Sequence, residues 1–231
     1  GDRIEVERGM LKIADSRITA TGDVRGWRGM PRIQAVFDSP GLDLALLIPE
    51  GERSPVRTAM EALTRGARLS ATVTIRNGRY QGVPFDEIQA KVSGGDDAIV
   101  LDPVTGRMGK GAIAGQTRVA LPPGKPAAVE STLHLKGIAV EPVFHSVGIK
   151  EPPFTGLLTL DGAIRGDGTH PKGTAPTLNG DVKVLVADGR FRKLSATSKI
   201  AGLLNLTSQL AGKADVSEQG MPFDCVSGRV V

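Results

Sequence analysis

Histidine and cysteine are the side chains that most often bind metals or act as nucleophiles, and this 231-residue chain has three histidines and one cysteine. His134, His145 and His170 lie on separate segments, and none has the spacing of a metal site. Cys225 has no second cysteine for a CxxC motif or a disulfide, so we interpret it as a small, half-buried apolar residue. These residues predict neither a metal site nor a cysteine nucleophile.

Carboxylates form the second set of candidates. Asp96, Asp97 and Asp102 are close together in a turn-rich segment. They lack the Asp/Asn-Gly spacing and the distal Glu of a calcium loop, so we interpret them as solvated turn residues. Asp86 and Asp224 each follow Pro-Phe in the string Gly-x-Pro-Phe-Asp, a context that favours a turn former over a general base.

Glycines that could cradle a phosphate are present in the segment 106–115, but in the wrong context. A strand pattern follows them, whereas a phosphate-binding loop opens a helix. The chain contains no Gly-x-Ser-x-Gly string. We therefore expect a protein that is not an enzyme and that has no cofactor and no metal.

Composition and charge restrict the class of protein further. Hydrophobic residues make up 40% of the chain and aromatic residues 3%, with 30 glycines and 15 prolines, which indicates a core poor in rings and many turns. The 29 basic and 25 acidic residues leave a net charge of only +4. With so few rings to stack on bases, this balance argues against a nucleic-acid partner. Scattered basic residues such as Arg28 and Arg32 could meet anionic lipid headgroups, although solvation alone explains them.

Targeting and membrane-spanning segments are not evident in the sequence. The longest apolar run, Leu44–Ile48, is far shorter than the roughly 20 residues of a membrane helix, and no signal peptide is visible. The chain starts at Gly1 without Met and stops inside a strand-like pattern, Ser227–Val231. We expect it to be a piece of a longer protein.

Alternating apolar and polar residues predict strands along most of the chain. Apolar residues occupy every second position of 69–75, and three valines do the same in 181–186. One face of each strand is apolar, as in an antiparallel sheet with one buried face. Turn dipeptides between such runs predict hairpin turns at Asn77-Gly78, Gly94-Gly95, Asp161-Gly162 and Asp188-Gly189.

Two segments have the periodicity of helices. Ser54-Pro55 predicts a helix start, Val56–Arg65 its body and Gly66 its end. The second predicted helix, 196–211, either covers a core or caps a groove, and one face of it holds Ile200, Leu203, Leu204 and Leu210.

Internal similarity links the two halves of the chain. Segments 69–80 and 180–191 share their alternation, their turn dipeptide, the following Arg and a final aromatic residue. Each is followed, directly or after an insertion, by a Gly-x-Pro-Phe-Asp string, at 82–86 and 220–224. The shared order predicts a repeat.

Upstream segments complete the predicted repeat. Residues 37–48 match residues 133–144, so two tandem units cover about 33–92 and 129–230 of one continuous β domain. Stacked units make an elongated sheet, and a sheet with one apolar face must either pack on a second layer or curl. Small aliphatic residues suit an elongated, twisted antiparallel sheet curled into an open apolar groove, with two or three short helices. An ordinary sandwich stays open as the alternative.

Several of these strings resemble the AsmA-like proteins, which are related to TamB, of Gram-negative envelopes. The strongest match is Leu178–Val231, which contains Asp-Gly-Arg-Phe at 188–191, the Leu-rich segment 200–206, Gly-Met-Pro-Phe-Asp at 220–224 and a final strand. It resembles the AsmA-like C-terminal region. Segments 41–47 and 137–143 are similar to the family's short strand before a helical turn.

The resemblance implies a location and a function. It implies a periplasmic protein that is anchored to the inner membrane in its full-length form, with membrane contacts made by parts outside this chain. It implies a non-enzymatic role in outer-membrane biogenesis, carrying phospholipid between the two membranes in an apolar β-groove. Envelope proteins or neighbouring repeats are further expected partners.

A groove of aliphatic side chains would bury acyl chains without specific polar contacts, at roughly 0.8 kcal/mol per methylene. Plain core packing is the alternative role for each groove candidate. The candidates are the apolar positions of the alternating strands, namely Leu69, Ala71, Val73, Ile75, Leu133, Leu135, Leu158, Leu160, Val182, Val184 and Val186.

Two other functions stay open at this point. The same sheet, with a closed core and no lipid, could be a structural or protein-interaction module of the envelope. A carbohydrate-active β-solenoid enzyme is disfavoured, because no pair of carboxylates stands out and aromatic platforms for sugars are rare.

Overall fold

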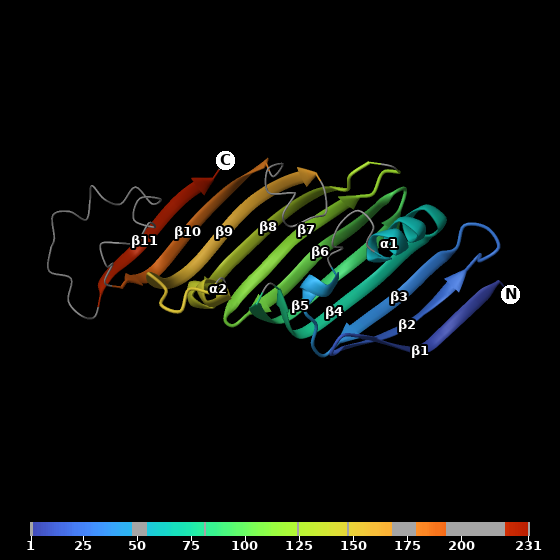
Figure 1. Ribbon diagram of the computed structural model, residues 1–231, viewed down its shortest axis with the longest axis horizontal. Coiled ribbons are helices and arrows are strands. Elements are labelled where there is room, and N and C mark those ends of the chain that lie inside the picture. The colour runs from blue at the N-terminus through green and yellow to red at the C-terminus, as the bar shows by residue number, and fades with distance from the viewer. Residues whose placement is uncertain are drawn as a thin grey trace.

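The computed structural model describes residues 2–47, 55–80, 82–123, 125–146, 148–167, 179–192 and 220–230. In these residues the strands form one open sheet of eleven whose order in space is their order in the chain, with β1 and β11 as the edges (Figure 1). The strands are β1 Arg3–Ile13, β2 Ser16–Arg25, β3 Arg32–Ser39, β4 Arg68–Tyr80, β5 Val83–Gly95, β6 Ala98–Met108, β7 Gly111–Ala120, β8 Ala128–Ala139, β9 Phe154–Asp167, β10 Asn179–Phe191 and β11 Met221–Val230. The predicted fold class, a mainly β chain with one long open sheet, is confirmed.

Nine of the ten strand pairs are antiparallel, and one is parallel. The parallel pair is β3 with β4, because the chain between them makes a crossover instead of a hairpin. The crossover contains the 3-10 turn η1, Leu44–Leu47, and the helix α1, Pro55–Gly66. The helix predicted for Val56–Arg65 is therefore confirmed, whereas the one predicted for 196–211, with Ile200, Leu203, Leu204 and Leu210, lies outside the described residues.

The hairpin turns predicted at Asn77-Gly78 and Asp188-Gly189 are wrong. Both dipeptides lie inside long strands, β4 and β10. Asn77 and Asp188 have φ angles of 50° and 51°, so each has the left-handed backbone that these dipeptides favour, but the strand continues beyond it. In β10 the register against β9 shifts at this point, between Ala187 and Arg190. The dipeptides thus mark an irregularity within a strand.

The other two predicted turns differ from each other. Asp161-Gly162 lies within the regular part of β9, paired with β8 and β10, so that prediction is also wrong. Gly94-Gly95 ends β5, directly before the β5–β6 turn. The turn itself is made by Asp96-Asp97, both with left-handed backbone.

A phenylalanine ring covers the glycine of each irregular dipeptide. A Cβ atom on Gly78 would lie 2.2 Å from Cζ of Phe85, and one on Gly189 would lie 2.0 Å from Cζ of Phe223. The ring therefore fills the space that a side chain would need. Both predicted repeat units contain this pair of a glycine and a Pro-Phe-Asp phenylalanine, which supports the repeat; the division into units stays a prediction.

Small core clusters lie at the ends of the strands. Leu42, Ile75 and Phe85 form one cluster, beside η1. Ile99, Leu121 and Ala127 form another, with Met60 of α1 packed against it. A third group is aromatic. Phe144 lies in helix α2, Val140–Ser146, and packs edge-on against Phe154 of β9. The rings of Phe191 and Phe223 also contact Phe154.

Candidate functional site

One face of the sheet has an unbroken apolar row of side chains from the first strand to the last. On this face, residues that lie directly opposite each other on neighbouring strands form a row with one residue from each strand, which we call the central row. None of its members is polar: Gly9, Ala20, Phe37, Val73, Ala90, Val104, Gly115, Leu133, Gly162, Val182 and Val230, from β1 to β11. At about 4.8 Å per strand the row is about 48 Å long.

The next row along the strands faces the other way and is mostly polar. It includes Thr74 of β4, His134 of β8, Asp161 of β9, Lys183 of β10 and Arg229 of β11. Because side chains alternate between faces, the two rows define an apolar face and a polar face of the sheet.

All eleven candidates from the sequence lie on the apolar face. Leu135, Leu160 and Val184 are direct neighbours across β8, β9 and β10, and Ile75 and Val186 belong to the same face through the central row. The predicted residues thus share a surface, although they are spread over residues 69–186. Whether this surface holds lipid stays a prediction.

The apolar face is uncovered on β8 and β9, while its margins are packed. Leu133 and Ile164 are 37% and 39% exposed. In contrast, Ala71, Ile75 and Val186 are buried, so these three candidates belong to the core and the other eight stay accessible. Helix α1 packs over one margin and α2 with its aromatic group over the other, at opposite ends of the strands (Figure 1).

Glycines inside the strands also favour the apolar face, a pattern that the sequence analysis missed. Gly22, Gly106, Gly115 and Gly180 all lie on it, and a Cβ atom on any of them would lie 2.1–2.6 Å from a neighbouring strand's carbonyl oxygen. Glycines let strands bend, since bending crowds the side chains of the inner face. They therefore favour a sheet that curls towards its apolar face. In the sequence, these glycines occupy the same alternate positions as the flanking apolar residues, and this spacing could have revealed them.

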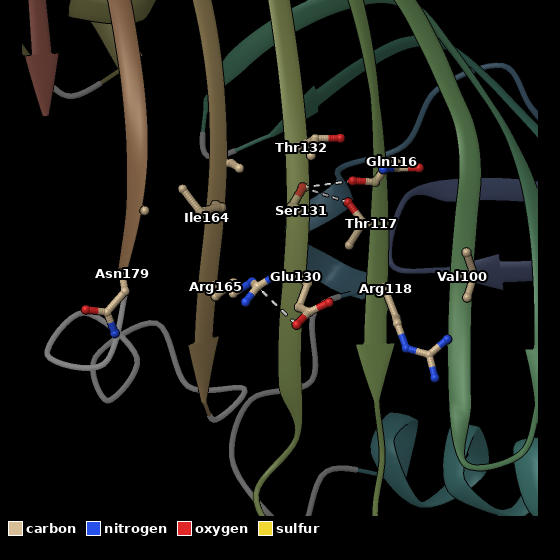
Figure 2. A pocket seen from close by; sticks show the side chains of 12 residues that line it. Val100, Gln116, Thr117, Arg118, Glu130, Ser131, Thr132, Ile164, Arg165 and Asn179 are labelled. Atoms are coloured by element: carbon tan, nitrogen blue, oxygen red, sulfur yellow. Dashed lines mark hydrogen bonds and ion pairs between the residues drawn. The ribbon is translucent and has the colours of Figure 1, made fainter. Parts of the chain in front are cut away.

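A hollow of about 550 Å³ lies near the ends of β7 to β10, lined mainly by polar-face residues (Figure 2). In it, Glu130 lies 3.5 Å from Arg165. Thr117 and Ser131 also border the hollow, but they are in register with Leu101 and Ile164 on the apolar face, where their hydroxyls lie 2.9 Å apart.

Ion pairs between neighbouring strands cover much of the polar face. Nε of Arg229 donates to Oδ1 of Asp181 at 2.7 Å, which lowers the pKa of the Asp181 carboxyl and raises that of the guanidinium. The pKa of Asp43 is also lowered, first by the N–H of Ala45 and then by Arg79. Asp181, Arg229 and Arg79 are exposed and Asp43 is only partly buried, so each pair stabilises the sheet modestly.

The remaining candidate residues have separate positions. Asp96 and Asp97 bind Arg68 and Arg65, which ties the β5–β6 turn to the end of α1. Asp86 accepts a hydrogen bond from the N–H of Gly109 at 2.6 Å and so supports the β6–β7 turn.

The residues with metal-binding or nucleophilic side chains do not converge. His134 lies 2.6 Å from Asp161, His145 is in α2, and His170 lies outside the described residues. Cys225 is exposed rather than half-buried, because it lies on the polar face of edge strand β11. Among the described residues no cluster of three potential metal ligands occurs.

Comparison with known families decides the identity of this sheet. The family model of the AsmA family matches residues 49–226, which is more than half of the chain. The chain belongs to the AsmA family. The suspected resemblance is thereby confirmed, while searches of curated proteins and of solved structures found no match.

Membership of the AsmA family places the protein in a broad functional context. The family is associated with the cell envelope and with lipid transport, and it is not known for enzymatic activity. Within the described part of this AsmA-family chain, no helix is both long enough and apolar enough to span a membrane.

Proposed function

We propose that this chain is a non-enzymatic, lipid-binding segment that carries phospholipid acyl chains along its apolar face, between the inner and outer membranes of the envelope. The observation that carries the proposal is the central row, which crosses all eleven strands without a polar side chain. The periplasm is the compartment in which such a segment would act. Phospholipid is its partner, and membranes are reached through parts of the protein outside this chain.

The dimensions of the row support this function. Half of the roughly 30 Å hydrocarbon core of a bilayer corresponds to one acyl chain, so a row of about 48 Å is about three times as long as one chain. A lipid on it would exchange one set of aliphatic contacts for an equivalent set as it moves. The headgroup would stay in water at the margin, because the face is open rather than enclosed.

The eight accessible candidates are the proposed contacts. They are Leu69, Val73, Leu133, Leu135, Leu158, Leu160, Val182 and Val184, and each is intermediate in burial or exposed. Aliphatic side chains in this state have apolar surface left to bury, at roughly 25 cal/mol per Å².

Native mass spectrometry with lipid extraction tests the proposal, on protein purified without detergent. We expect phospholipid to co-purify with the wild type and to be lost in Val184→Asp, which places a carboxylate on the apolar face. The control is Leu185→Asp, one residue along β10 on the polar face. Circular dichroism confirms that both variants are folded.

Lipid-free wild-type protein in repeated preparations would contradict the proposal and favour a structural or protein-interaction module. Equal loss of lipid in both aspartate variants would also contradict it, because the effect would then not depend on the face.

A further inference from the structure

Four arginines are direct neighbours across the first four strands, at one end of the polar face. Arg3 pairs in register with Arg25, Arg25 with Arg32, and Arg32 with Arg68. We call them the arginine row. Like charges directly opposite each other destabilise a sheet. The row therefore does not serve the stability of the fold, and an anionic partner would relieve its repulsion.

Acidic side chains neutralise the arginine row only in part. Asp23 lies 2.7 Å from Arg25 and 3.5 Å from Arg3. Glu5 lies 3.7 Å from Arg3, and Asp96 forms an ion pair with Arg68. Arg32 is exposed and has no ion pair within the described part of the chain. The centre of the row thus keeps a free positive charge.

The loop Gly26–Pro31 lies beside the row, because it connects Arg25 to Arg32. It exposes two large apolar side chains: Trp27 is 49% and Met30 is 59% exposed. The guanidinium of Arg28 lies 5.0 Å from the centre of the Trp27 ring and adds another positive charge. The N–H of Arg68 donates to the carbonyl of Pro31 at 2.8 Å and fixes the loop to β4.

We propose that the arginine row and the loop 26–31 form a docking surface for an anionic phospholipid bilayer. One guanidinium group can donate two parallel hydrogen bonds to two oxygens of a phosphate. Tryptophan is favoured at the interface between lipid headgroups and acyl chains. A free phosphate would account for the arginines alone, whereas a bilayer also accounts for the exposed Trp27 and Met30. This inference does not depend on whether the apolar face carries lipid.

Intrinsic fluorescence tests the docking surface directly, because Trp27 is the only tryptophan in the chain. The probes are vesicles of phosphatidylcholine alone and of phosphatidylcholine with an equal share of phosphatidylglycerol. We expect the emission to shift to shorter wavelength with the anionic vesicles only, and added salt to reverse the shift.

Charge variants show which residues bind. Replacing Arg28→Gln and Arg32→Gln together should weaken partitioning onto anionic vesicles about fivefold for each arginine, which corresponds to about 1 kcal/mol each. The melting temperature should stay unchanged or rise, since repulsion in the row is removed. The matched control replaces Arg107→Gln and Lys110→Gln, two exposed basic residues at the opposite end of the strands.

Three results would overturn the proposal. One is the absence of any fluorescence shift with anionic vesicles, which would leave a protein partner as the occupant. Another is equal loss of partitioning in the control. The third is displacement of bound vesicles by inorganic phosphate at a concentration where chloride of equal ionic strength has no effect, which would assign the row to free phosphate.

Discussion

The exposed leucines of the two faces offer a sharp test of the central row. Leu133 lies on the apolar face and is 37% exposed, while Leu157 lies on the polar face and is 42% exposed. Leu133→Asp and Leu157→Asp are therefore the same substitution at nearly the same exposure. We expect both to lower the free energy of unfolding by a similar amount, about 1 kcal/mol.

Their effects on lipid binding should differ, and the structure gives the size of the difference. Strands are about 4.8 Å apart, and an extended acyl chain advances about 1.25 Å per methylene, so about four methylenes lie over each strand. Each contributes roughly 0.8 kcal/mol when fully buried and about half of that on an open face. Losing one strand's contacts in Leu133→Asp therefore removes about 1.6 kcal/mol and raises Kd about fifteenfold.

A fluorescence titration with a phospholipid that has a fluorophore on its acyl chain measures Kd for the wild type and both variants. Leu157→Asp should bind as the wild type does. A Leu133→Asp variant that is folded and keeps the wild-type Kd would refute the reasoning, and so would an equal loss in the two variants.

The remaining predictions concern the fold and the polar face. Gly78→Ala and Phe85→Ala should each lower the free energy of unfolding measured by chemical denaturation, Phe85→Ala by about 3 kcal/mol. The double variant should lose less than the sum of the two, because the new methyl group takes the space that the ring leaves. Strictly additive losses would refute the contact between Gly78 and the Phe85 ring. Since its bond to Arg229 lowers the pKa of Asp181, this pair stabilises the fold above the usual aspartate pKa and loses that effect as pH falls through the lower, folded-state pKa. Replacing Arg229→Gln should therefore reduce the loss of stability in acid, measured as melting temperature against pH, and an unchanged acid limb would contradict this. Maleimide labelling of the exposed Cys225 should be fast and leave lipid retention unchanged, whereas lost retention would show that the polar face takes part.

Period-two alternation was enough to predict which side chains share the apolar face. The prediction succeeds because alternation is preserved across register pairs: once Val73 and Val182 lie on a common row, their neighbours at every second position follow. The end of α1 could also be predicted from local sequence, since the helix ends at Gly66 itself.

Features that depend on pairing could not be predicted in this way. Asn77-Gly78 favours a left-handed backbone in either a turn or a strand irregularity, and only the ring of Phe85 on the adjacent strand distinguishes the two. The arginine row was invisible for the same reason, because its first and last members are far apart in the chain and meet only through the register of β1 to β4.

The order of strands in space, which is also their order in the chain, makes the length of the sheet adjustable. Each strand hydrogen-bonds only to its immediate neighbours, so a hairpin added at an edge would leave the existing strand pairs unchanged. Two added strands would lengthen the apolar path by about 10 Å and, because they run in opposite directions, return the chain to the same margin of the sheet. The span of such a protein can thus be set by gene duplication of short segments, independently of what the path carries.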